Sequence, residues 1–406
     1  MTHCDALAAC SELPGGLTRV FLSPEQRAAN ELVLGWMREA GMRARLDAIG
    51  NVIGRYEADA AAAPGAPCLM LGSHLDTVRD AGRYDGMLGV VSAIECVHAL
   101  NAAQRRLPFA IEVAGFADEE GVRFGATLLG SRALAATFDA AALDATDANG
   151  RTLSEALCNF GLDPARIHEA ARKRDDVLAY MELHIEQGPV LEAEGLAVGV
   201  VTAINGATRY ALEINGVAGH AGTVPMALRR DALAAAAECV LAIERRCGRE
   251  PELVGTVGKL EALPGAVNVV PGKARFSIDI RAPQDAQRVT AAQDVLADLY
   301  AICKRRGVTL NASKIHEGAV AACAPWLMEQ LGNAITAQNI PVRRLPSGAG
   351  HDGVAIIALC DIGMLFVRCA GGISHNPAEA VAVEDVGMGA RVLLHFIENF
   401  QPRRQA

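Results

Sequence analysis

The order of apolar runs and helical patterns constrains the fold of this 406-residue chain more than any other feature of its sequence. Short apolar runs, which are typical of buried strands, alternate with helical patterns. CLMLGS at 68–73 precedes a helical pattern at 86–100, and FAIEVAGFA at 109–117 precedes another near 126–136. This alternation is typical of a sheet whose strands are joined by helices. We therefore expect an α/β domain in which helices cover both faces of a mixed sheet.

The alternation is interrupted after about residue 209. The next segment reads as strand, helix, two strands, helix and strand, in the stretches RYALEINGVAG, RRDALAAAAECVLAIERRC, ELVGTVGKLEAL, NVVPGKARFSIDIRA, 285–306 and GVTLNASKIHEG. This order matches a ferredoxin-like unit. The α/β pattern resumes at APWLMEQLGNAITAQN. We expect an inserted α+β domain at 211–321 within a domain made of 1–210 and 322–406.

Charge and composition exclude several classes of partner. A net charge of −9 argues against nucleic acid or an anionic membrane, and 4% aromatic residues leave little for base stacking. The eleven cysteines contain no C-x-x-C pair, the N-terminus does not read as a signal peptide, and Asp361 interrupts the best apolar run near the end. We expect a cytoplasmic protein with reduced thiols.

A histidine and two aspartates follow the first apolar run, in GSHLDTVRDAGRYDG. Residues two apart in a strand point the same way, so His74 and Asp76 can lie together at the strand end. There Asp76 can accept the imidazole N–H and fix which ring nitrogen is free for a metal, while Asp85 supplies a second carboxylate. Taken alone, a loop with solvated aspartates explains the stretch equally well.

Three consecutive acids, Asp118, Glu119 and Glu120, follow the run at 109–117. Adjacent carboxylates at a strand end repel one another unless a cation or hydrogen bonds neutralise them. One glutamate could bind a metal while its neighbour accepts protons; an acidic surface turn is the alternative.

Two further histidines lie near the ends of apolar runs, His184 in MELHIEQGPVLE and His375 in the glycine-rich GGISHNPAE. Open α/β sheets bind ligands beyond the carboxyl ends of their strands. Together with the aspartates and glutamates above, these imidazoles suit two adjacent divalent ions, either zinc or manganese.

Motifs along nearly the whole chain resemble one known family. They are GSHLDTV, YDGMLGV, DEEGVRF, ELHIEQGP, GHAGTVPM, NVVPG, DIRA, GAGHD and GISHNPAE. The sequence resembles the two-metal amidohydrolases of the aminoacylase and carboxypeptidase superfamily. Within it, the chain is similar to the N-carbamoyl-L-amino acid hydrolases, β-ureidopropionases and allantoate amidohydrolases. The histidine before IEQGP favours this branch, because peptidase relatives usually carry a carboxylate ligand there.

The resemblance implies a role for each motif residue. The domain of 1–210 and 322–406 would be catalytic, and Asp85 would bridge two divalent ions. Asp76 would support His74, and Glu119 would be the general base that takes a proton from water and returns it to the leaving nitrogen. The implied metal ligands are His74, Asp85, Glu120, His184 and His375.

The same resemblance places further residues against the substrate. His220, Asn268 and Arg281 lie in the inserted domain, and Arg281 is suited to bidentate capture of a carboxylate. Arg209, at the hinge, and Gln187 match additional substrate contacts. Ordinary turn residues and a solvated arginine are the alternative reading of the first three.

Two other expectations concern assembly and the segment after the insertion. The resemblance implies a homodimer through the inserted lid domain, with substrate contacts made partly across the interface. His351 and Asp352, in GAGHDG, are expected to be positioning residues near the site, and a purely structural role is the alternative.

The expected reaction is hydrolysis of a ureido C–N bond in a small carboxylate substrate. Allantoate is the leading candidate because DEEGVRF resembles the allantoate-type members. The alternatives are an N-carbamoyl-L-amino acid and the β-ureidopropionase substrate N-carbamoyl-β-alanine. His184 disfavours an exopeptidase or N-acyl-amino acid deacylase, and the complete ligand set with Glu119 disfavours a non-catalytic binding protein.

Overall fold

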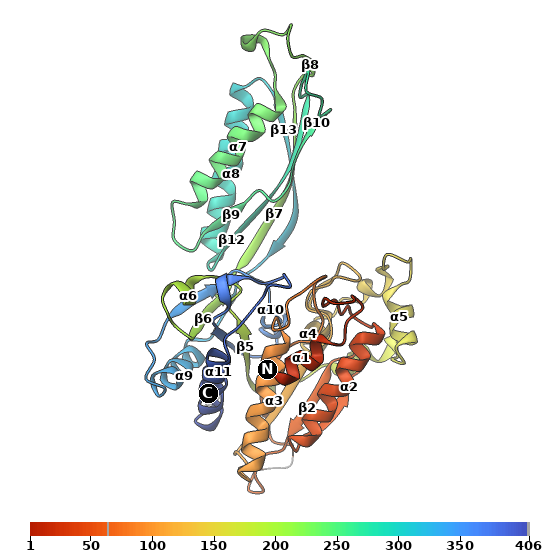
Figure 1. Cartoon of the computed structure of the whole chain (residues 1–406), viewed down its shortest axis with the longest axis vertical. Helices are drawn as coiled ribbons and strands as arrows, with labels where there is room; N and C mark the ends of the chain where they lie inside the picture. Colours follow the sequence, from red (N-terminus) through yellow and green to blue (C-terminus); the bar gives the residue numbers. More distant parts are fainter. Residues whose placement is uncertain (63–64, 404–406) are drawn as a thin grey trace. The chain divides into compact units, whose positions relative to one another are not determined.

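The computed structural model describes residues 1–62 and 65–403, which form two compact units (Figure 1). The first contains 1–202, 323–345 and the described part of 349–406, and the second contains 203–322 and 346–348. The second unit therefore begins before the expected boundary at 211, because one uninterrupted strand, β7 (Gly206–Asn215), crosses that position. The expected end of the first domain at 404–406 lies outside the described residues.

The first unit is built on a mixed sheet of nine strands. In spatial order these are β1 (Arg43–Leu46), β2 (Val52–Tyr56), β4 (Ala110–Phe116), β3 (Cys68–His74), β5 (Val177–Ile185), β16 (Ile362–Val367), β6 (Val198–Ile204) and β14 (Ala321–Ala322), with β15 (Arg344–Ser347) also paired to β6. The central strands β4, β3, β5 and β16 run parallel and are almost fully buried. Strands covered on both faces must be apolar throughout, which explains the apolar runs.

Helices pack with this sheet in two hydrophobic cores. The larger core includes residues of α1 (Thr2–Ala8), α2 (Pro24–Glu39), α3 (Met87–Ala102), α9 (Pro325–Thr336) and α11 (Val383–Glu398). The smaller core includes residues of α4 (Leu129–Leu134), α5 (Leu153–Asn159) and η2 (Pro164–Ala170). The remaining short helices are η1 (Ala140–Asp144), η3 (Arg174–Asp176), α6 (Val190–Ala193), α10 (Gly353–Ile356) and η5 (Ala370–Gly372).

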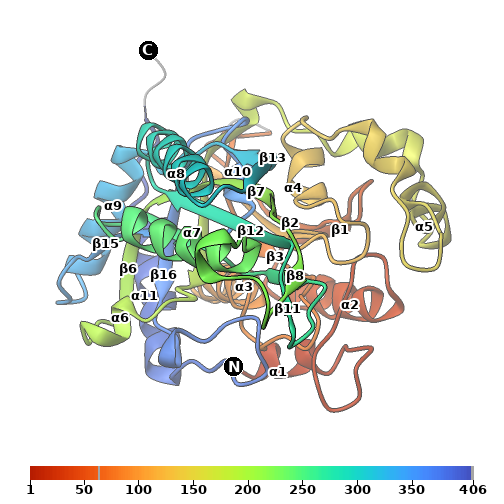
Figure 2. The ribbon, with the colours of Figure 1, turned by 90° about the horizontal axis from the view of Figure 1, so that it is seen from above.

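The second unit is a five-stranded antiparallel sheet with two helices packed side by side against it (Figure 2). Its strands are β7, β9 (Val254–Thr256), β10 (Leu260–Leu263), β12 (Lys273–Ala282) and β13 (Thr309–Gly318), and its helices are η4 (Met226–Leu228), α7 (Ala232–Cys247) and α8 (Asp285–Arg305). The order β10-β12-β7-β13 is the strand order of a ferredoxin-like unit. The predicted fold class is thus confirmed. A separate ribbon pairs β8 (Gly219–His220) with β11 (Val269–Val270).

Among the described residues, no helix is both long and apolar enough to span a bilayer. All eleven cysteines lie in this part of the chain and are unpaired, and all except Cys10 and Cys158 are buried.

Candidate metal centre

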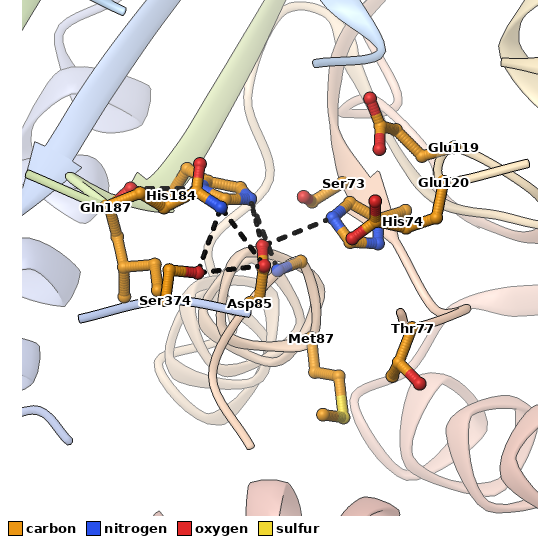
Figure 3. Close-up of polar contacts among 12 residues, drawn as sticks. Ser73, His74, Thr77, Asp85, Met87, Glu119, Glu120, His184, Gln187 and Ser374 are labelled. Atoms are coloured by element: carbon orange, nitrogen blue, oxygen red, sulfur yellow. Dashed lines mark hydrogen bonds and ion pairs between the residues drawn. The ribbon is translucent and has the colours of Figure 1, made fainter. Parts of the chain in front are cut away.

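Imidazole and carboxylate groups meet where the parallel strands of the first unit end (Figure 3). His74 is the last residue of β3, and His184 is next to the last in β5. Glu120 follows β4, Asp85 lies just before α3, and His375 is in the loop after β16. Because parallel strands direct their carboxyl ends to the same edge, residues far apart in the sequence come together there.

Asp85 lies at the centre of this group. Its Oδ1 is 3.1 Å from Nε2 of His184 and 3.5 Å from Nε2 of His74, and its Oδ2 is 3.2 Å from Nε2 of His375. Oε1 of Glu120 is 3.4 Å from the same His375 nitrogen. Two groups of three potential ligands result, His74–Asp85–His184 and Asp85–Glu120–His375, with the ligand atoms of each group within 4.8 Å of one another. Asp85 belongs to both.

The charges of the centre fit a cation. Burial, with the charges of Asp85 and Asp76, raises the pKa of Glu120 to about 7, and burial raises the pKa of Glu119 well above its usual value. Oδ1 of Asp85 makes no hydrogen bond to any described residue although two imidazole nitrogens lie close to it. Buried carboxylates are costly without a compensating positive charge, so this donor set suits divalent metal.

Gly86 allows helix α3 to begin against the metal centre. A Cβ atom on Gly86 would lie 2.5 Å from three atoms of the His74 ring, and the residue has a φ of +69°. Only glycine adopts this conformation easily and leaves room for the imidazole. The YDG sequence thus brings Asp85 and His74 together through the absence of a side chain.

Asp76 holds the acidic segment after β4 rather than bonding to His74 through its carboxylate. Its Oδ1 accepts the main-chain N–H of Glu119 at 3.0 Å, and its Oδ2 accepts that of Glu120 at 3.1 Å. Nδ1 of His74 is 3.0 Å from the main-chain carbonyl of Asp76 and 3.7 Å from the carboxylate. His74 and Asp76 thus lie together as expected, but the imidazole nitrogen contacts the main-chain carbonyl of Asp76 more closely than its carboxylate, because the chain leaves the extended conformation after His74. The carbonyl contact still leaves Nε2 on the side of Asp85.

Glu119 is buried beside this centre. It also forms a possible ligand group with His74 and Glu120. A carboxylate in this position has the geometry either to accept a proton or to bind metal, and the two roles are separable by experiment.

Gln187 contacts the shared carboxylate directly. Its Nε2 donates to Oδ2 of Asp85 and to Oγ of Ser374, both at 3.0 Å (Figure 3). Gln187 and His375 have φ values of +56° and +54°, which non-glycine residues adopt rarely. Such strain is often found at functional sites. Gln187 thus helps to hold Asp85, a contact that its expected role in substrate binding did not include.

Several polar residues of the centre were missed by sequence reasoning. Glu182 is buried in β5 and accepts hydrogen bonds from Oγ of Ser73 at 2.9 Å and from the Tyr180 hydroxyl at 3.0 Å. With His184 and His351 it forms a further potential ligand group. An acid inside the apolar run AYMELHI was the available signal, because a fully buried glutamate needs partners.

His351 and Asp352 are both buried, and the His351 ring lies 4.5 Å from that of His184. Burial and the charge of His184 lower the pKa of His351 well below its usual value. The His351 ring therefore packs against that of His184, and the positioning role of His351 and Asp352 stays a prediction.

The expected substrate contacts of the second unit form two separate pairs. Arg209 and Arg281 line a cavity of about 540 Å³ with Asp279, which accepts hydrogen bonds from both. His220 lies on the β8–β11 ribbon, beyond the other end of β7, and its neighbour Ala221 donates its main-chain N–H to Asn268. The distance along β7 from Arg209 to the last residue of the strand, Asn215, is about 20 Å.

The chain is similar to several known proteins. Residues 70–399 match peptidase family M20/M25/M40. The chain is 43% identical over 383 residues to N-carbamoyl-L-amino acid amidohydrolase of Geobacillus stearothermophilus, covering 94% of this chain and 93% of that protein. It is 40% identical over 424 residues to allantoate deiminase 1 of Glycine max, covering 97% and 87%. A solved hydantoinase/carbamoylase family amidase from Burkholderia multivorans superimposes with a TM-score of 0.90 at 33% identity, covering 98% and 95%.

Proposed function

Because the chain belongs to peptidase family M20/M25/M40 and is therefore a metal-dependent hydrolase, we propose that it cleaves the ureido C–N bond of a small carboxylate, with allantoate the leading candidate. The observation that carries the proposal is the pair of ligand groups that share Asp85, with Glu119 beside them. His184 in this set, in place of the carboxylate usual in peptidase relatives, favours ureido substrates over peptides.

The two ligand groups would hold two divalent ions, zinc or manganese, one on each side of Asp85. When bound, such metal supplies Lewis-acid polarisation and makes water a nucleophile near neutral pH. Glu119 would take a proton from the attacking water and deliver it to the leaving nitrogen as the C–N bond breaks. Asp76 keeps Glu119 and Glu120 in place through their main-chain N–H groups.

Arg281 would bind the substrate carboxylate. Asp279 takes the Nε and one Nη2 hydrogen of this guanidinium, and the carbonyl of Gly348 accepts from Nη1 at 2.6 Å. Two of the five guanidinium hydrogens remain for a ligand. The cavity volume of about 540 Å³ is in the range of small-molecule sites.

A substrate panel tests the reaction. With zinc or manganese added, we expect ammonia release from allantoate to exceed that from N-carbamoyl-L-amino acids, N-carbamoyl-β-alanine and ureidoglycolate by at least about tenfold in kcat/KM, which corresponds to about 1.4 kcal/mol. N-carbamoyl-L-amino acids are the second candidate because of the identity to the Geobacillus enzyme. Faster turnover of these substrates would reverse the assignment, and amine release from N-acyl-amino acids or peptides alone would contradict it.

We also propose a homodimer in which each substrate site is completed by the partner. About 20 Å of strand separates Arg209 from the end of β7 that leads to the β8–β11 ribbon, so the pairs Arg209–Arg281 and His220–Asn268 are too far apart for one small substrate to touch both. A second copy could supply the other pair, as closed two-fold assemblies commonly do. The cytoplasmic location is likewise a proposal, supported by the unpaired, mostly buried cysteines.

Complementation between two inactive chains tests the composite site. We expect His220→Ala and Glu119→Gln to be nearly inactive alone but to recover about a quarter of wild-type activity when co-expressed, since half of randomly formed dimers are mixed and one of their two sites is intact. Size-exclusion chromatography with light scattering checks the assembly. A monomer, or a dimer without complementation, would contradict the composite site.

A further inference from the structure

Glu379 lies behind the metal centre, and the proposed reaction gives it no role. It is the last residue of the SHNPAE motif and is 5% exposed. Its Oε1 accepts the main-chain N–H groups of Tyr84 at 2.8 Å and Asp85 at 3.2 Å. Its Oε2 accepts the Ser374 hydroxyl at 3.0 Å. One carboxylate therefore joins the segment that carries Asp85 to the loop that carries His375.

Ser374 extends this connection to the shared ligand itself. Its Oγ is 3.1 Å from Oδ2 of Asp85 and accepts Nε2 of Gln187 at 3.0 Å. The single hydroxyl hydrogen of Ser374 goes to Glu379, and the connection continues through Gln187, whose Nε2 donates both to Oγ of Ser374 and to Oδ2 of Asp85. Glu379 thus reaches Asp85 twice, directly through the main chain and through the side chains of Ser374 and Gln187. Any shift of Glu379 would move both ends of the Asp85–His375 contact.

The chain reserves space for Glu379 at Gly82. A Cβ atom on Gly82 would lie 2.2 to 2.3 Å from three atoms of the Glu379 side chain. No substitution with a side chain fits there unless Glu379 moves. The segment around Gly82 and the segment around Glu379 are nearly three hundred residues apart in sequence, yet they pack closely against each other.

The segments that Glu379 joins have little regular structure of their own. Asp85 lies in the irregular stretch between β3 and α3, and His375 lies between η5 and α11 with a φ of +54°. The His375 side chain is half exposed, so packing does little to hold it. An unusual backbone conformation persists only where its surroundings determine it.

We propose that Glu379 is a positioning residue that fixes Asp85 and His375 relative to each other and so sets the metal affinity of the Asp85–Glu120–His375 group. Residues that orient metal ligands commonly contribute 10- to 100-fold in metal affinity. The inference rests on the metal centre and is independent of which substrate the enzyme uses.

Metal titration of full-length variants tests this role without a substrate. We expect Glu379→Ala to raise the manganese or zinc concentration at half-saturation by about 10- to 100-fold, and to retain less metal per chain after dialysis, measured by inductively coupled plasma mass spectrometry. Glu379→Gln should stay within about threefold of wild type, because its amide oxygen can still accept both main-chain N–H groups and its amide nitrogen can donate to Ser374.

A second variant and a matched control separate positioning from folding. Gly82→Ala leaves Glu379 in the sequence but displaces it, so it should weaken metal binding as Glu379→Ala does. Glu112→Ala removes another buried glutamate, bonded to Arg172, and should lower Tm while metal affinity stays unchanged. Unchanged metal affinity in Glu379→Ala, or equal loss in Glu379→Gln, would overturn the proposal.

Discussion

Replacing Asp85 with asparagine should remove most of the bound metal and lower the rate of hydrolysis by on the order of 10³-fold or more, because metal supplies several kcal/mol of transition-state stabilisation. Asp85 is the residue common to both three-residue ligand groups at the strand ends. Its two oxygens face different histidines, Oδ1 toward His74 and His184 and Oδ2 toward His375. Asparagine has nearly the same shape but replaces one oxygen with an amide nitrogen that cannot bind a cation.

Metal content and activity of the purified variant check this expectation together. Asp47→Asn is the matched control, because Asp47 is also buried and accepts main-chain N–H groups of Ile49, Gly50 and Asn51 without touching a ligand. The control should lose stability and keep its metal. An Asp85→Asn chain that holds as much metal as wild type would remove Asp85 from the centre.

The fold could be predicted from the sequence wherever burial acts on a whole element. CLMLGS and FAIEVAGFA became β3 and β4 because parallel strands covered on both faces must be apolar along their length. The ferredoxin-like order of 211–321 was predicted from alternating strand and helix patterns and is confirmed. The start of the second unit at Ala203 and its inclusion of Pro346–Gly348 were not predicted, since contacts rather than composition define them.

The bounds of the helix expected near 126–136 also could not be predicted from the sequence, because a tertiary contact sets them. In the structure α4 covers only Leu129–Leu134, and Leu128 before it has a φ of +63°. The main-chain N–H of Leu129 is bonded to the carbonyl of Asp118 instead of continuing a helix backward. A tertiary contact thus ends the element where local propensity alone would extend it.

At the site, the residues near the ends of strands could be predicted from the sequence, but the contacts between loops could not. The five expected ligands and Glu119 come together because parallel strands direct their carboxyl ends, and the loops that follow them, to one edge of the sheet. The hydrogen-bond partners of Asp76 and the connections made by Ser374 and Glu379 depend on irregular backbone, which leaves no periodic signal. The family resemblance, now confirmed, identified the motif SHNPAE without indicating what its final glutamate contacts.

Replacing Glu119 with glutamine should lower kcat by about 10² to 10⁴-fold while the bound metal remains, because the variant loses a proton acceptor and not a shared ligand. The adjacent Glu120→Gln is the matched control and should lose metal from the group formed with Asp85 and His375. Both side chains lie in one segment whose main chain is held by Asp76, so neither change disturbs the backbone bonds.

Two neighbouring glutamates that receive the same substitution should therefore give opposite results in metal content, measured by mass spectrometry of dialysed protein. The comparison distinguishes two roles that the geometry allows for Glu119, because this residue also lies close enough to His74 and Glu120 to share a metal ion with them. Loss of metal in Glu119→Gln would make this residue a ligand, and the proton would then need another acceptor. Retained activity in Glu119→Gln would leave the buried carboxylate beside His74 without a chemical role, and the proposed route of the proton from water to the leaving nitrogen would fail.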